Sequence, residues 1–188
     1  MEFLTQLWLA IVLSAVFVFV VSSIMHMLIP IHRGDFRKLS AEDVVLEQLR
    51  SHALSPGEYM FPCAGSMKDM GTPEMLEKYN RGPVGFLTIM APGPVNMAKA
   101  LSQWFVYSLV ISVFCAYVAW HVLDPGAHYL SVFRIVGTVA FLAYAGAYAP
   151  NSIWKGIRWT TTIKYFFDGA IYAMVTAGTF GWLWPTAS

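Results

Sequence analysis

Residues 7–29 read LWLAIVLSAVFVFVVSSIMHMLI, and no Asp, Glu, Lys or Arg interrupts them. A helix of about 20 such residues is long enough to cross the hydrocarbon core of a bilayer. Three further apolar stretches follow, at Leu101–Val122, Tyr129–Ala149 and Tyr165–Trp184. The sequence therefore predicts an all-α integral membrane protein, in which a bundle of four transmembrane helices forms a single membrane domain over residues 1–188.

The composition is typical of a multi-pass membrane protein. Of the 188 residues, 57% are hydrophobic and 12% are charged, whereas globular domains carry roughly 25% charged residues. The formal net charge is +1, so the charge balance does not favour binding of nucleic acid. The lipid bilayer is the first partner that the sequence predicts.

Basic residues are placed unevenly along the chain. Outside the apolar stretches, lysines and arginines fall between residues 30 and 100 and between residues 150 and 164. The two ends of the chain and the Leu123–His128 connection carry none. Because positive residues are retained on the cytoplasmic side, both termini are predicted outside the cytoplasm. The predicted location of the protein is the inner (plasma) membrane of a bacterium.

Residues 30–100 form one long connection, which is predicted to be a small cytoplasmic cap segment between the first and second helices. Ser40 and Asp43 resemble a capping box at the start of a short helix. Two short helices and two short strands are expected in the segment, at Ala41–Leu54, from Thr72 to about Gly82, at Glu58–Pro62 and at Val84–Met90. The cap either covers the helix ends or offers a docking surface, and the sequence leaves both alternatives open.

An ionisable side chain within a membrane span is a functional candidate by default. His26 lies near the inner end of the first stretch and Asp168 lies near the inner end of the fourth, so we expect the two at one membrane level. Asp168 is expected to meet His26, Lys164 or Arg158. His26, Asp168 and Arg158 are thus the candidate catalytic residues, with anchoring of the helices at the interface as the structural alternative. His32 is expected to be solvated.

Soft ligand atoms gather near His26. Met25 and Met27 flank it, and Cys63 lies in the long connection. Thioether, thiolate and imidazole ligands suit Cu(I), but the spacing matches no metal motif, and methionine is common in packing. The sequence therefore predicts no metal site and no cofactor, and His26, Met25, Met27 and Cys63 are the metal-ligand candidates if one exists.

Small residues recur every four positions along the fourth stretch, at Gly169, Ala173, Ala177 and Gly181. Such a stripe lets another helix approach closely, which drives helix association in lipid. It is the predicted helix-packing interface, either within the bundle or toward another subunit.

No phosphate-binding loop and no Cys-x-x-Cys motif is present. We therefore expect a non-enzymatic accessory or assembly subunit of a larger membrane complex, with other membrane subunits or a second copy as its partners. One alternative is a membrane-bound oxidoreductase or transferase with an inner-leaflet site. Another is a small oligomeric transporter, because four helices with few polar side chains line no obvious water path alone.

Overall fold

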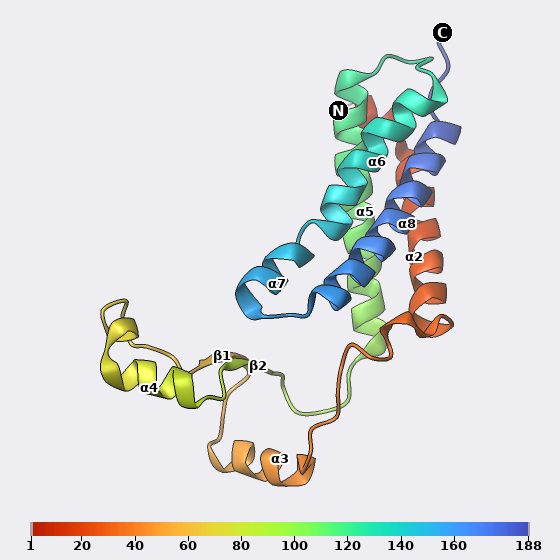
Figure 1. Cartoon of the computed structure of the whole chain (residues 1–188). Helices are drawn as coiled ribbons and strands as arrows, with labels where there is room; N and C mark the ends of the chain where they lie inside the picture. The colour runs from red at the N-terminus through yellow and green to blue at the C-terminus, as the bar shows by residue number, and fades with distance from the viewer. Residues whose placement is uncertain (1, 188) are drawn as a thin grey trace. The chain divides into compact units, whose positions relative to one another are not determined.

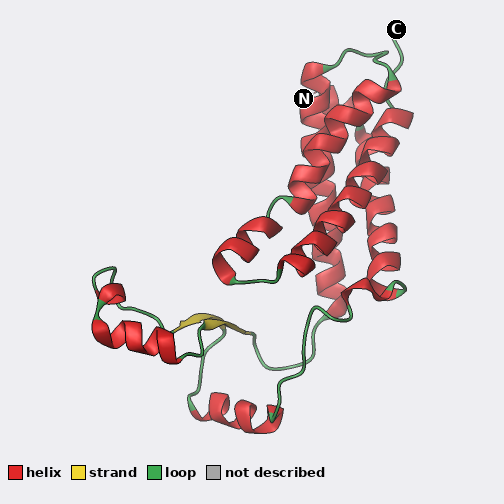
Figure 2. Cartoon of the chain, in the orientation of Figure 1, coloured by secondary structure: helices red, strands yellow, loops and turns green. Residues whose placement is uncertain are grey.

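The computed structural model describes residues 2–187 and is mostly helical (Figures 1 and 2). The end positions of the predicted domain, 1 and 188, lie outside the described residues. The chain forms two compact units, Met1–Asp35 with Asn96–Ser188, and Phe36–Val95. Each unit is described below by itself.

The first unit contains most of the helices. They are α1 (Glu2–Gln6), α2 (Trp8–Met27), the short 3-10 helix η1 (Pro30–His32), α5 (Met97–Val122), α6 (Tyr129–Ala145), α7 (Tyr148–Lys155) and α8 (Trp159–Trp182). Asn96 caps α5 by accepting a hydrogen bond from the Lys99 amide at 3.0 Å, so this helix begins four residues before the predicted Leu101.

Four long helices pack around one core. α2 contacts α5 and α8, and α6 contacts the same two helices, so each helix has two neighbours. The centre is filled by small and β-branched side chains, including Val18, Ala116 and Val136, each 0% exposed. Small core residues let the helix backbones approach closely, which is how helices associate in a lipid environment.

Three helical segments are long and apolar enough to cross a membrane: Trp8–Met27, Met97–Val122 and Tyr129–Lys155. The membrane class is therefore supported, and the count of such segments in the described chain is three, not the predicted four. α8 covers the fourth predicted stretch but is not among them. Its polar side chains lower its hydropathy, and the buried ones are Thr161, Thr162, Asp168, Thr176 and Thr179.

The third segment is not one straight helix. α6 ends at Ala145 and α7 begins at Tyr148, so the helical path changes direction within the predicted stretch Tyr129–Ala149 (Figure 1). Gly146 lies at this change of direction, where an added Cβ would stand 2.5 Å from the Leu142 carbonyl oxygen. The segment then continues to Lys155, six residues beyond the predicted end.

The two ends of the chain lie at the same end of this unit (Figure 1). The Phe3 ring packs edge-on against His121 of α5, at a centroid distance of 6.4 Å. The Gly126 amide donates to the carbonyl oxygen of Pro185 at 2.7 Å. The end of α5 therefore contacts α1, and the α5–α6 turn holds the C-terminal segment.

The second unit contains α3 (Glu42–Ser51), β1 (Gly57–Phe61), η2 (Asp69–Gly71), α4 (Pro73–Arg81) and β2 (Gly85–Ile89). The strands pair antiparallel, from Gly57 opposite Ile89 to Phe61 opposite Gly85. The Thr72 hydroxyl accepts from the Met75 amide at 3.4 Å and caps α4 as expected. The predicted capping box of α3 is wrong, because Ala41 occupies the N-cap in a left-handed conformation with φ 54° and no side-chain hydrogen bond caps the helix.

Candidate functional site

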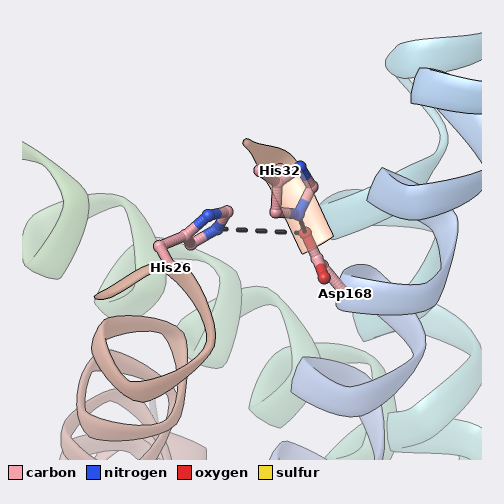
Figure 3. Close-up of side chains that lie close together, drawn as sticks. All are labelled: His26, His32 and Asp168. Atoms are coloured by element: carbon pink, nitrogen blue, oxygen red, sulfur yellow. Dashed lines mark hydrogen bonds and ion pairs between the residues drawn. The ribbon is translucent and has the colours of Figure 1, made fainter. Parts of the chain in front are cut away.

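Two histidines and an aspartate converge in the first unit (Figure 3). His26 comes from the last turn of α2, His32 from η1, and Asp168 from α8. Asp168 Oδ2 lies 2.8 Å from His32 Nε2 and 3.8 Å from His26 Nε2. One ligand atom from each of the three residues can be chosen so that all lie within 4.8 Å of one another. We call these three residues the His–His–Asp cluster.

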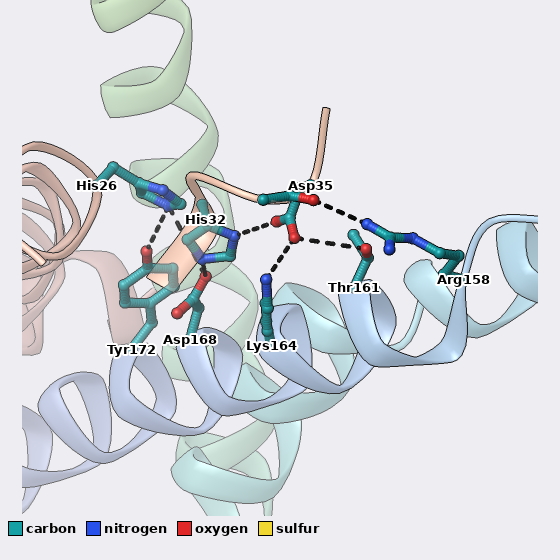
Figure 4. A network of polar contacts seen from close by, with 9 residues as sticks. His26, His32, Asp35, Arg158, Thr161, Lys164, Asp168 and Tyr172 are labelled. Atoms are coloured by element: carbon teal, nitrogen blue, oxygen red, sulfur yellow. Dashed lines mark hydrogen bonds and ion pairs between the residues drawn. The ribbon is translucent and has the colours of Figure 1, made fainter. Parts of the chain in front are cut away.

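The turn after α2 brings His32 to this position. α2 ends at Met27, and Pro30 starts η1, where proline needs no amide partner. The Arg158 guanidinium donates to the Gly34 carbonyl oxygen at 2.8 Å, and Lys164 Nζ donates to Asp35 Oδ1 at 2.6 Å (Figure 4). The turn is therefore held on α8 by two cationic side chains.

Asp35 joins this turn to the His–His–Asp cluster. Its Oδ2 lies 2.7 Å from His32 Nδ1, so the ring nitrogen donates to the carboxylate. Burial acts to raise the pKa of Asp35, but hydrogen bonds from Lys164 and His32 outweigh burial, and the pKa lies below its ordinary value. Asp35 therefore stays a carboxylate at neutral pH.

Aromatic rings fix the plane of the His32 imidazole. It contacts His26, at a centroid distance of 4.8 Å, and Tyr165, which stacks on it at 5.1 Å. Tyr165 also stacks on Tyr148, with centroids 4.2 Å apart and the rings 4° from parallel. These two ring contacts limit the rotation of the imidazole and help to keep its Nε2 toward Asp168.

A cavity of about 530 Å³ adjoins the cluster and is lined by residues of α2, α5, α6, α7 and α8. Aromatic side chains make up much of its wall, and these are Trp104, Tyr144, Tyr148, Tyr165 and Tyr172. His26 and Asp168 also line it. Met27 and Met97 line it too, and they are 80% and 61% exposed. We call this space the tyrosine-lined cavity, and these methionines make it reachable from outside the bundle.

Two buried side-chain atoms in residues 2–187 have no hydrogen-bond partner, Asp168 Oδ1 and Tyr144 Oη. Both residues line the tyrosine-lined cavity. The hydroxyls of Ser108 and Thr176 lie near Tyr144 and donate to carbonyl oxygens of their own helices, so toward Tyr144 they can act only as acceptors. Asp168 Oδ1 is the more significant of the two, because an unpaired charged acceptor is the costlier to bury.

The structure brings together some of the predicted site residues and separates others. His26 and Asp168 are close, as expected from their depth in the chain's apolar stretches. Arg158 and Lys164, the two other partners considered for Asp168, do not contact it. They bind the turn at Gly34 and Asp35 instead. The expectation that His32 is solvated is wrong, since its side chain is only 16% exposed. The spacing of His32 and Asp35, three residues apart after a proline, was the one local signal for this contact.

The sulfur-containing candidates are dispersed. Met25 is buried in the bundle core, and Met27 lines the cavity mouth. Cys63 is exposed and belongs to the second unit. Of the four metal-ligand candidates His26, Met25, Met27 and Cys63, only His26 belongs to the His–His–Asp cluster.

The small-residue stripe of α8 lies against α6. A Cβ added to Gly169 would stand 2.8 Å from the Ala145 Cβ, and one added to Gly181 would stand 2.6 Å from the Tyr129 ring. Ala173 and Ala177 are buried, 4% and 0% exposed. This face therefore contacts α6 within the chain; that it also seats another subunit stays a prediction.

In comparisons with known proteins, no family model, no curated protein and no solved structure matches this chain. What the site can do is inferred from its own side chains.

Proposed function

We propose that this chain is a membrane-embedded protein that binds an amphipathic, lipid-soluble molecule in the tyrosine-lined cavity. The observation that supports this most directly is that the two partnerless buried polar atoms among the described residues, on Asp168 and Tyr144, both belong to its wall. Buried polar groups in proteins are nearly always hydrogen-bonded. An occupant that carries a hydroxyl would donate to Asp168 Oδ1 and supply the missing partner.

The shape of the cavity supports an occupant with a long apolar part. Ligand pockets are mostly apolar, with few polar groups that fix the orientation of the ligand. Here the polar groups gather at His26 and Asp168, and exposed apolar side chains such as Met27 and Leu101 lie along the wall. Entry from the hydrocarbon phase would keep the apolar chain out of water throughout.

Four membrane crossings, rather than three, suit this arrangement. α8 has 24 residues, about 36 Å of helix at 1.5 Å per residue, which matches the thickness of a bilayer core. Its buried polar side chains point into the bundle, where polar groups of membrane helices belong. An even number of crossings also agrees with the two chain ends lying at one end of the helical unit (Figure 1).

The basic residues favour an orientation of this bundle. Lys155, Arg158 and Lys164 flank the cavity end of α8, which by the positive-inside rule is the cytoplasmic end. The tyrosine-lined cavity would then open to the inner leaflet of the plasma membrane, with both termini outside. The enzyme alternative required such an inner-leaflet site, and the accessory-subunit interpretation stays a prediction.

The orientation predicts which positions react with an impermeant thiol reagent in intact cells. In a Cys63→Ser background, Glu2→Cys and Thr186→Cys should be labelled, and Lys68→Cys should be labelled only after the membrane is permeabilised. Cys115 is buried and serves as the unreactive internal control. Labelling of Lys68→Cys alone in intact cells would reverse the orientation, and labelling of only one terminus would remove the fourth crossing.

Binding is tested on purified, metal-free, full-length protein with three probes that share one alkyl chain. These probes are the fatty alcohol, the fatty acid and the alkane, and bound probe is measured by native mass spectrometry. The alcohol should bind most tightly. The alkane cannot donate to Asp168 Oδ1, and the carboxylate of the fatty acid is repelled by the charge of Asp168.

A cavity-filling variant and its neighbour on the same helix provide the control. Ala100 lines the cavity and Ala98 does not, although both are exposed residues of α5. Ala100→Phe should weaken binding of the alcohol about tenfold or more, a loss of roughly 1.4 kcal/mol, and Ala98→Phe should bind as the wild type does. Equal binding by Ala100→Phe and Ala98→Phe, or tightest binding of the fatty acid, would refute the proposal.

A further inference from the structure

The geometry points to a binding site for one divalent transition-metal ion, with His26 Nε2, His32 Nε2 and Asp168 Oδ2 as its protein ligands. This inference does not rest on the proposed occupant of the tyrosine-lined cavity. It concerns the cluster itself, which three separate elements, α2, η1 and α8, build from residues far apart in the chain (Figure 3).

The distances suit coordination by one ion. Bonds of about 2.0–2.2 Å to nitrogen and oxygen ligands place neighbouring ligand atoms of one ion roughly 3–3.5 Å apart. Asp168 Oδ2 lies 2.8 Å from one imidazole nitrogen and 3.8 Å from the other, which brackets that separation. The three ligand atoms lie within 4.8 Å of one another, so the side chains would have to move closer together to share the ion.

The second nitrogen of His32 is held as it is in many metal sites. A histidine that binds a metal donates its other N–H to a carboxylate or a carbonyl, which fixes the tautomer and the orientation of the ring. Here Nδ1 of His32 donates to Asp35, and Asp35 is fixed by Lys164 (Figure 4). Nε2 of His32 is hydrogen-bonded to Asp168 Oδ2 at 2.8 Å, and a bound ion would take the place of the proton between these two atoms.

The charges of the surrounding groups also favour a cation. Asp35 is compensated by Lys164 at 2.6 Å, whereas the ion-pair partners of Asp168 are imidazoles, His26 and His32. Asp168 is 2% exposed, and a buried carboxylate needs a positive partner or a metal. A metal ion bound to Asp168 Oδ2 would supply that positive partner.

The ligand set selects the class of ion. Two imidazole nitrogens and one carboxylate oxygen suit Zn²⁺, Fe²⁺ and their neighbours, whereas Mg²⁺ and Ca²⁺ prefer sites built from oxygen atoms. Three protein ligands leave at least one coordination position open. His26 Nε2 is hydrogen-bonded to Tyr172 Oη at 3.2 Å, a contact that the ion would replace. Because His26, Asp168 and Tyr172 line the tyrosine-lined cavity, we expect an open position to face its interior.

Zinc binding to the chelator-treated full-length protein tests the inference. Equilibrium dialysis followed by metal analysis should give one Zn²⁺ for each chain, and an excess of Mg²⁺ should not displace it. His26→Ala and Asp168→Asn should each lower the zinc affinity about tenfold or more, and Asp35→Asn should lower it about 10–100-fold through the orientation of His32. His52→Ala, an exposed histidine of the second unit, is the control and should bind as the wild type does.

His26→Ala is the decisive variant. The His26 side chain is 43% exposed. Its removal takes away the ring contact with His32 but leaves the hydrogen bonds of His32 and Lys164 to Asp35 in place, so the protein should still fold. Zn²⁺ should raise the thermal unfolding temperature of the wild type but not that of His26→Ala, because an ion stabilises only a state that binds it. Absence of zinc binding by the wild type, or equal zinc binding by His26→Ala, would overturn the assignment. Either result would leave the metal-free amphiphile test unaffected.

Discussion

Gly169→Ala should destabilise the helical unit by about 1–3 kcal/mol, the usual range for overpacking a tight core. The added Cβ would stand 2.8 Å from the Ala145 Cβ and 3.2 Å from the Ala145 backbone nitrogen. Backbone on a packed helix cannot rotate away as a flexible side chain can, so α6 and α8 must separate. Every contact along the small-residue stripe would then weaken together, because dispersion attraction falls steeply with distance. Thermal unfolding in detergent, with the helical signal as readout, measures the change.

Gly178 provides the matched control on the same helix. A Cβ added there would meet only the Tyr129 hydroxyl, at 3.6 Å, which is ordinary contact. Gly178→Ala should therefore leave the stability unchanged or raise it by up to about 1 kcal/mol, because alanine favours the helix over glycine. If both variants unfold at the same temperature, close contact between α6 and α8 does not determine the stability of the bundle.

Apolar stretches predict helices well in this chain because lipid and core both demand apolar side chains. α2, α5 and α6 were therefore found from hydropathy within a few residues of their ends. α8 shows where that signal weakens. Its Thr162, Asp168 and Thr176 are buried in the bundle, so a helix surrounded by its neighbours can carry polar groups that a lipid-facing helix cannot.

The candidate site was predictable only in part. The proximity of His26 and Asp168 follows from depth, since each lies near the same end of its apolar stretch. The position of His32 depends on contacts of Arg158 and Lys164 with the turn, across 124 and 129 residues of sequence. Local sequence patterns do not predict contacts between residues so far apart in the chain, and the sequence alone therefore predicts a solvated His32.

The tyrosine-lined cavity could not be anticipated for a related reason. Trp104, Tyr144 and Tyr172 come from three different helices, and each reads in the sequence as an ordinary apolar or interfacial residue. A cavity is the space that packing leaves unfilled, and its existence depends on how all of these side chains meet. Partnerless atoms such as Asp168 Oδ1 become visible only once every other contact is known.

Lys164→Ala should destabilise the turn that carries His32 by about 1–3 kcal/mol, the range for leaving a buried acceptor without its partner. The Asp35 side chain is 2% exposed, and Lys164 Nζ lies 2.6 Å from its Oδ1. Without the ammonium group, the carboxylate keeps only His32 and a longer contact with Thr161, at 3.5 Å. The turn should then detach from α8, and amide hydrogen exchange at residues 32–35 should accelerate.

An exposed ion pair separates this effect from a general loss of charge. Lys38 and Glu42 lie 3.5 Å apart with side chains 80% and 45% exposed, so Lys38→Ala should change stability by less than about 1 kcal/mol. Asp35→Asn added to Lys164→Ala removes the uncompensated charge, so the double variant should lose less than the sum of the two single variants. Added salt should weaken the Lys38 pair and leave the Lys164 pair nearly unchanged, because buried charges are screened less. Equal and small effects of Lys164→Ala and Lys38→Ala would mean that η1 is held by the Arg158 contact and by ring stacking, and that Asp35 is not the group that fixes His32.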